Sequence, residues 1–135
     1  MPPTEPLPPG KTLEEVVSQI GLYPIEAYDF VRRGLEYTVE RIHANAEDPT
    51  VSRHVSGAQL CDGLREFALL EWGMLARTVL ERWNIRRTID FGRIVFALVD
   101  NGWMSKTDDD DVEDFRDVFD FKTAFDTKYR IEMKA

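Results

Sequence analysis

Few side chains in this 135-residue sequence are of the types that carry out catalysis, and they are scattered along the chain. The candidates for a nucleophile or a base are Cys61, His43 and His54. Cys61 falls on the same helical face as Leu64 and Ala68, which predicts an inert core thiol whose pKa is raised by burial. No nucleophile, base and orienting group can be assembled from these residues, so we expect that the protein is not an enzyme. Because the G-x-G-x-x-G, G-x-S-x-G and H-E-x-x-H motifs are absent, we also expect no cofactor.

Arg53 and His54 lie immediately before a predicted helix start and could together bind an anion. Ser56 followed by Gln59 is a capping box, in which each side chain satisfies the free backbone amide of the other residue. The amides at such a helix N-terminus attract negative charge, and the two basic side chains would strengthen that attraction. The alternative is that His54 only hydrogen-bonds its own loop. His43 ends a different helix, where the helix dipole favours a cation.

Most of the net charge of −8 is concentrated in residues 108–120. This segment contains eight acidic residues and one basic residue, Arg116, so its charge is −7. The acidic patch consists of Asp108, Asp109, Asp110, Asp111, Glu113 and Asp114. Such a run repels phosphate and attracts basic partners or divalent cations. It lacks the alternating ligands and central glycine of a calcium loop, because Val112 interrupts it, so we predict no metal site. The simpler interpretation is a solvated loop that keeps the protein soluble.

Three arginines, Arg86, Arg87 and Arg93, fall at the turn and start of a predicted helix, where they could reach DNA phosphates or base edges. Asp90 lies on the same first turn, and the acidic residues 108–120 would meet the DNA backbone. DNA affinity at physiological salt depends on neutralising several phosphates, which these acids oppose. We therefore expect that nucleic acid is not the partner, and a winged-helix-like DNA-binding regulator is the alternative function.

The elements that must position these side chains are mostly helices. Thr12 with Glu15 forms another capping box, and apolar residues recur at three- and four-residue spacing in the segments that follow. Gly34 within the second apolar stripe indicates close packing by a neighbour. The predicted helices cover residues 12–20, 24–43, 56–72, 75–83 and 89–101, the last capped by Thr88, and a short final helix is capped by Asp120.

Residues 91–99 are apolar nearly all round, so this helix must be central or lie at a subunit interface. Residues 104–121 fit either a helix, from the spacing of Val112, Phe115 and Phe119, or two short extended segments joined by four aspartates. We predict the second arrangement, a β-hairpin. Three packed helices followed by a hairpin is the order of a winged helix, with residues 75–83 and 89–101 as its helix-turn-helix pair.

We therefore predict a mostly α fold, a compact helical domain that is winged-helix-like, with a helix-turn-helix and a short C-terminal β-hairpin. This domain would span residues 12–126, after a disordered proline-rich lead-in at 1–11 and before a tail at 127–135. The composition, 43% hydrophobic and 31% charged, suits a soluble chain with a real core. No apolar run reaches the ~18 to 20 residues of a membrane span, and the first residues lack the positive region and the apolar run expected of a secretory signal. We expect no membrane contact and a cytoplasmic location.

Six short stretches, taken together, are similar to a known group of sequences. They are Tyr23-Pro24 with Ala27-Tyr28, and residues 34–39, 53–57, 63–65, 90–96 and 118–121. In these stretches the chain resembles an uncharacterised family known chiefly from planctomycete and verrucomicrobial genomes, sometimes labelled a restricted repeat protein. The family has no assigned activity, so the resemblance implies no catalytic residue, and this chain shows no internal repeat.

The function that these observations favour is a small protein-interaction or adaptor module. The apolar helix at 91–99, Trp103 and the acidic patch would form an aromatic anchor beside a charged rim. We expect the partner to be a protein of basic charge, or a second copy of the chain.

Overall fold

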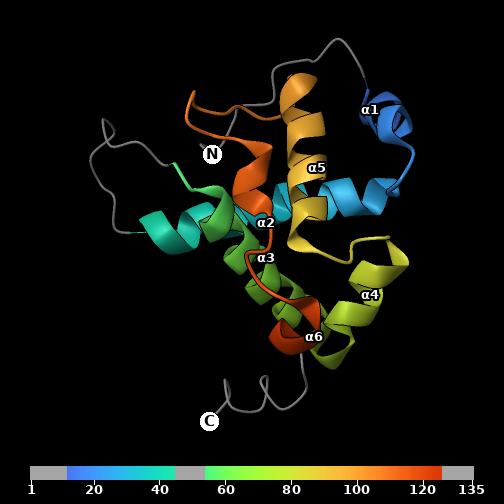
Figure 1. Cartoon of the computed structure of the whole chain (residues 1–135), viewed down its shortest axis with the longest axis vertical. Helices are drawn as coiled ribbons and strands as arrows, with labels where there is room; N and C mark the ends of the chain where they lie inside the picture. Colours follow the sequence, from blue (N-terminus) through green and yellow to red (C-terminus); the bar gives the residue numbers. More distant parts are fainter. Residues whose placement is uncertain (1–11, 45–53, 126–135) are drawn as a thin grey trace.

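Helices make up the regular structure of the part of the chain that the computed structural model describes, residues 12–44 and 54–125 (Figure 1). The elements are α1 (Leu13–Ile20), α2 (Ile25–His43), α3 (Gly57–Trp72), η1 (Gly73–Leu75), α4 (Ala76–Arg82), α5 (Thr88–Asp100), η2 (Val112–Phe115) and α6 (Phe121–Ala124). The predicted mostly α fold is therefore confirmed. None of the described helices has both the length and the apolar character needed to cross a membrane.

Helices α2 and α3 pack closely because each presents a glycine to the other. A Cβ atom on Gly34 would lie 2.2 Å from Cδ2 of Leu64, and one on Gly63 would lie 1.9 Å from Oγ1 of Thr38. Only a residue without a side chain leaves room for contacts this close. The close packing predicted at Gly34 is confirmed.

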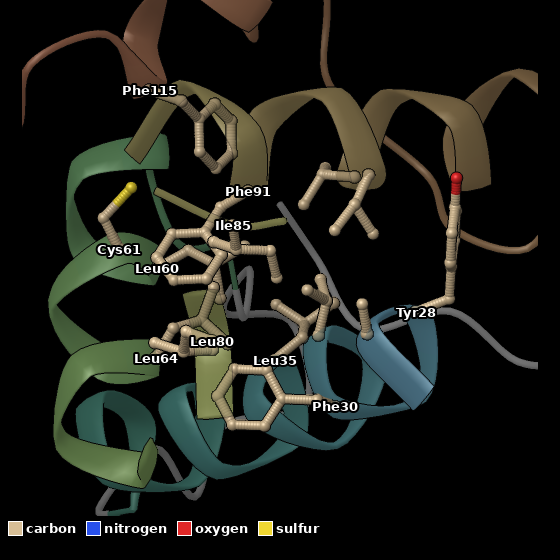
Figure 2. Packing of buried hydrophobic residues seen from close by; sticks show 14 of the residues in the cluster. Tyr28, Phe30, Leu35, Leu60, Cys61, Leu64, Leu80, Ile85, Phe91 and Phe115 are labelled. Carbon is tan, nitrogen blue, oxygen red and sulfur yellow. The ribbon is translucent and has the colours of Figure 1, made fainter. Parts of the chain in front are cut away.

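Helix α5 lies at the centre of the described residues, where it contacts α1, α2, α3 and η2 (Figure 1). Phe91, Ile94, Val95 and Leu98 of this helix are buried in the hydrophobic core. Figure 2 shows Phe91 and Phe115 above the side chains that α2 and α3 contribute to the same core. The central position predicted for this helix is confirmed, and most of its apolar surface is covered within a single chain.

Three of the four predicted helix caps are confirmed by their hydrogen bonds. The backbone amide of Glu15 donates to Oγ1 of Thr12 (3.2 Å) at the start of α1. Ser56 and Gln59 form the reciprocal capping box at the start of α3, with distances of 2.9 and 3.1 Å. The backbone amide of Lys122 donates to the carboxylate of Asp120 (3.1 Å), which caps α6. These bonds join residues two or three positions apart, so the local sequence specifies them.

The start of α5 differs from the prediction, because Thr88 is its first residue and not its cap. Thr88 is buried, and its hydroxyl accepts a hydrogen bond from the backbone amide of Val118 (3.0 Å). The carboxylate of Asp90 takes over the capping by accepting from the backbone amides of Arg86 and Arg87 (2.9 and 3.1 Å). Two otherwise unpaired amides at the helix start are satisfied in this way.

The predicted β-hairpin at residues 104–121 is wrong, since the described residues contain no strand and the helical turn η2 occupies this segment. Asp111 accepts from the backbone amide of Glu113, and Asp114 accepts from that of Asp111, both at 3.0 Å. The aspartates therefore cap a helical turn instead of forming the tip of a hairpin. Phe115 is buried against α5, where a Cβ atom on Gly92 would lie 2.8 Å from its side chain. The wing of a winged helix is a β-hairpin, so the described residues do not support the winged-helix prediction.

Candidate functional site

The structure describes all three candidates for catalysis, and each is buried or hydrogen-bonded within the chain. Cys61 is fully buried, as predicted, and burial, with a smaller effect of the neighbouring Asp62 carboxylate, raises the pKa of its thiol. Nε2 of His43 donates to the backbone oxygen of His54 (2.7 Å), which joins the end of α2 to the segment before α3. Cys61 is therefore part of the core, and His43 joins two segments of the chain.

The side chain of His54 binds an anion, but the anion is the chain's own Asp110. Nε2 of His54 lies 3.0 Å from Oδ1 of Asp110. The amide and hydroxyl of Thr107 donate to Oδ2 of the same carboxylate (2.8 and 3.2 Å). Burial of the carboxyl opposes its ionisation, yet the hydrogen bonds from Thr107 and His54 outweigh burial and lower the pKa of Asp110. Arg53, the other half of the predicted anion site, lies outside the described residues.

The acidic patch is divided between internal partners and solvent. Three of its six residues, Asp110, Asp111 and Asp114, accept hydrogen bonds within the turns that form η2 and the loop before it. A fourth, Glu113, accepts two hydrogen bonds from the guanidinium of Arg116 (2.6 and 3.1 Å). In the described part of the chain, no three His, Cys, Asp or Glu side chains are grouped so that they could hold a metal ion. Four of the six residues of this patch therefore have partners within the chain, and less of the patch is available to a partner protein than the sequence predicts.

Arg93, one of the three candidate DNA contacts, is directed toward a buried carboxylate. Nη1 of Arg93 donates to Oδ1 of Asp90 (3.1 Å), and the hydroxyl of Tyr23 donates to the same oxygen (2.6 Å). Asp90 is only 6% exposed and also caps α5, so this carboxylate joins the segment before α2 to the start of α5. The ion pair therefore holds the guanidinium of Arg93 beside the carboxylate of Asp90.

Arg86 and Arg87, the other two candidate DNA contacts, are exposed at the turn between α4 and α5. They line a pocket of about 300 Å³ that they share with Asp117 and Asp120. Two carboxylates in the same pocket offset the charge that a phosphate would meet there.

Trp103 is half-buried and packs beneath an arginine. The guanidinium carbon of Arg32, from α2, lies 4.7 Å from the centroid of the Trp103 ring. A cation stacked on the ring occupies the aromatic face that a partner would otherwise contact. The predicted anchor of Trp103 with the 91–99 helix is therefore largely used within the chain.

A different aromatic surface lies where α1, the start of α2 and the ends of α3 and α4 meet. We call it the tryptophan pocket, a hollow of about 450 Å³ whose lining consists of Leu13, Ile25, Glu26, Asp29, Arg33, Glu71, Trp72 and Trp83. The rings of Trp72 and Trp83 are nearly perpendicular, at 83°, with their centroids 5.3 Å apart. Phe30 packs on both rings, at 5.1 and 6.0 Å, and is itself fully buried. The two walls of the pocket are therefore supported from the core.

A glycine at the end of α3 brings the two tryptophans together. Gly73 has φ +55° and ψ −126°, a conformation that side chains disfavour, and it ends α3 directly after Trp72. The short turn η1 then leads into α4, and Trp83 is the residue directly after α4. The two rings meet because the chain reverses between them.

The rim of the tryptophan pocket is acidic. Asp29 and Arg33 form an ion pair one helical turn apart on α2 (3.0 Å), so their charges offset each other. Glu26 and Glu71 are exposed, and neither has an ion-pair or hydrogen-bond partner on its side chain among the described residues. Two uncompensated carboxylates therefore stand beside two aromatic rings.

Three large apolar side chains are exposed where α3 turns into α4. Leu70, Met74 and Leu75 are 68%, 61% and 63% accessible to solvent. We call these three residues the apolar corner. The sequence predicts a helix over residues 75–83, whereas Leu75 belongs to the 3-10 turn η1 and α4 begins at Ala76.

Nothing in the spacing of Trp72 and Trp83 predicts that they meet. The one signal available in the sequence is Glu71, which interrupts the apolar stripe just before the helix breaker Gly73. Comparisons of the chain with family models, with curated proteins and with solved structures found no match. The family resemblance described above therefore stays a prediction, and the functional argument depends on the surface chemistry of this chain.

Proposed function

We propose that this protein is an interaction module that binds a basic, amphipathic segment of a partner protein across the apolar corner and the tryptophan pocket. The observation that carries the proposal is the exposure of Leu70, Met74 and Leu75, which flank the pocket residues Glu71 and Trp72 along the chain. Large apolar side chains that gather on a surface and are bordered by polar groups mark interaction sites. An amphipathic helix places apolar residues at three- and four-residue spacing, which suits contact with such a surface.

The charge of the surface favours a basic partner over a second copy of the chain. Glu26 and Glu71 add negative charge at the rim, and the whole chain carries a net charge of −8. Like charges brought together in an interface cost free energy, whereas opposite charges speed the encounter. A partner rich in lysine or arginine should therefore bind this surface more favourably than an identical acidic chain does.

The observations support DNA binding less well. Arg93 is paired with Asp90, and Arg86 and Arg87 share their pocket with two carboxylates. The helix-turn-helix analogy depended on a hairpin wing, and the described residues contain no strand. We therefore do not extend the proposal to a DNA-binding regulator.

A pair of peptides that differ only in charge tests the proposal. One peptide carries leucine on one helical face and lysine on the other, and its control carries glutamate at the lysine positions. Fluorescence anisotropy with labelled peptides should show saturable binding of the lysine peptide and none of the glutamate peptide. Replacing Leu75 or Met74 with serine should weaken binding by about five- to tenfold, the usual cost of truncating a central anchor.

Ile42→Ser is the matched control variant, because Ile42 is also an exposed apolar residue, at 39%, but lies at the opposite end of α2 from the pocket. It should leave binding unchanged. Equal binding of the two peptides, or an equal loss in Ile42→Ser and Leu75→Ser, would contradict the proposal. A concentration-dependent dimer that Leu75→Ser abolishes would assign the corner to a second copy of the chain instead.

A further inference from the structure

The tryptophan pocket has the features of a site for one particular side chain. Trp72 and Trp83 both line it, with their rings in edge-to-face contact at 83° and their centroids 5.3 Å apart. Phe30 is stacked behind them at 5.1 and 6.0 Å and has no exposed surface. Rings that are held by a buried neighbour need no reordering when a ligand enters, which reduces the entropic cost of binding.

Two aromatic walls attract a cation. The face of an indole ring carries negative charge density, and tryptophan is the strongest of the aromatic side chains in cation–π attraction. Glu26 and Glu71 lie on the rim of the same pocket, and neither has a partner on its side chain among the described residues. An anion is therefore excluded, and a neutral apolar group would gain nothing from the two carboxylates.

The arrangement fits a methylated ammonium better than a bare one. The ammonium of unmodified lysine is a compact, strongly hydrated charge, which loses its water when it is placed against aromatic faces. Methyl groups spread that charge, reduce its hydration and add apolar contact with the rings. Leu13 and Ile25 line the same pocket and offer apolar contact for an aliphatic stem.

We propose that the tryptophan pocket binds the methylated ammonium group of a trimethyl-lysine in a partner protein. This inference rests on the proposed function and names the anchor side chain of the partner. Trp72 and Trp83 contact the methyl groups, while Glu26 and Glu71 supply the opposite charge at the rim.

A pair of small molecules of the same shape isolates the charge. Choline carries a trimethylammonium, and 3,3-dimethylbutanol has the same shape with carbon in place of the charged nitrogen. Nuclear magnetic resonance titrations of the indole N–H signals should show saturable shifts of Trp72 and Trp83 with choline. The neutral analogue should bind about tenfold more weakly, as expected for the loss of one cation–π contact. Equal affinity for the two molecules would overturn the inference.

Two charge variants locate the site without disturbing the core. Glu71→Gln and Glu26→Gln remove charge from exposed positions and should each weaken choline binding about two- to fivefold, a typical effect of one charge at a surface. Glu36→Gln removes another exposed charge of α2, one that does not line the pocket, and it should have no effect. Trp83→Leu should abolish the response, and Trp103→Leu, outside the pocket, should preserve it.

The peptides of the proposed function then separate the two ideas. A basic peptide with one trimethyl-lysine should bind about tenfold more tightly than the unmodified peptide. If both peptides bind equally and choline has no effect, the proposed function stands and the trimethyl-lysine inference fails. If choline saturates the pocket but neither peptide binds, the proposed function fails. Binding of phosphatidylcholine vesicles without preference for the methylated peptide would overturn the assignment of the cation to lysine.

Discussion

Replacing Tyr23 and Tyr28 with phenylalanine should change the stability of the protein in opposite directions. The two rings are neighbours, with centroids 6.4 Å apart, and both are buried. The hydroxyl of Tyr23 donates to Oδ1 of Asp90 (2.6 Å). The hydroxyl of Tyr28 is buried and has no hydrogen-bond partner among the described residues. Figure 2 shows the Tyr28 ring rising from α2 along α5, with its oxygen at the edge of the core.

The magnitude follows from what each hydroxyl does. Tyr23→Phe removes a hydrogen bond to a charged, buried acceptor, which should cost about 1.5 to 3 kcal/mol in the free energy of unfolding. Tyr28→Phe removes a polar group whose burial is uncompensated, and it should add about 1 kcal/mol. At about 4 °C per kcal/mol for a chain of this size, the two variants should melt about 10 to 16 °C apart.

Urea denaturation followed by circular dichroism, with matching thermal melts, measures both changes. Near-ultraviolet spectra that match the parent protein establish that neither variant repacks. A Tyr28→Phe variant that loses 1 kcal/mol or more, at the scale of an ordinary hydrogen bond, would show that the hydroxyl has a partner and would refute the reasoning. Loss of equal size in both variants would refute it as well.

The hydrogen bond between Tyr23 and Asp90 also predicts that the stability of the protein depends on pH. Burial first, and the hydrogen bond to Asp90 second, raise the pKa of Tyr23 above its ordinary value. The folded state then holds this proton more tightly than the unfolded state does. The corresponding stability is fully present below about pH 10 and is lost as the pH rises above it, where an unfolded tyrosine ionises. Tyr23→Phe should remove part of this alkaline loss in denaturation curves recorded across that range.

Three further predictions concern the packing, the thiol and the buried carboxylate. Gly63→Ala should destabilise the protein by about 2 to 3 kcal/mol in urea denaturation, because the new methyl group overlaps the buried side chain of Thr38. An unchanged midpoint would mean that α2 and α3 can separate. Cys61 should react with a thiol reagent only at the rate at which the protein opens, so fast labelling of the folded protein would contradict its burial. Asp110→Asn should lower stability at neutral pH by about 1 to 2 kcal/mol, the scale of the charged hydrogen bonds that its carboxylate makes with His54 and Thr107. Because the pKa of Asp110 is lowered, its contribution is present above about pH 4 and is lost on acidification, so the Asn variant should show a shallower acid loss.

Local hydrogen bonds explain why many helix ends could be predicted. The Thr12 cap, the capping box at Ser56 and the cap at Asp120 involve partners two or three residues along the chain. Local periodicity likewise predicted the burial of Cys61 and the central place of the 91–99 helix. The hairpin prediction failed for a related reason, since a run of aspartates suits a helical cap as well as a turn. Burial of Phe115 against Gly92, which only the folded chain reveals, decided between the two.

The sequence by itself determined the helical class, most of the helix ends and the uneven distribution of charge. Only the tertiary structure decided which charged groups are free. Asp110 pairs with His54, which lies 56 residues away, and Arg93 turns to Asp90 beneath Tyr23. It also decided that Trp72 and Trp83 meet, because the chain reverses at Gly73 and both rings pack on Phe30. Caps and helical periodicity depend on neighbours within one turn, whereas a pocket depends on the packing of whole helices, which no local pattern records.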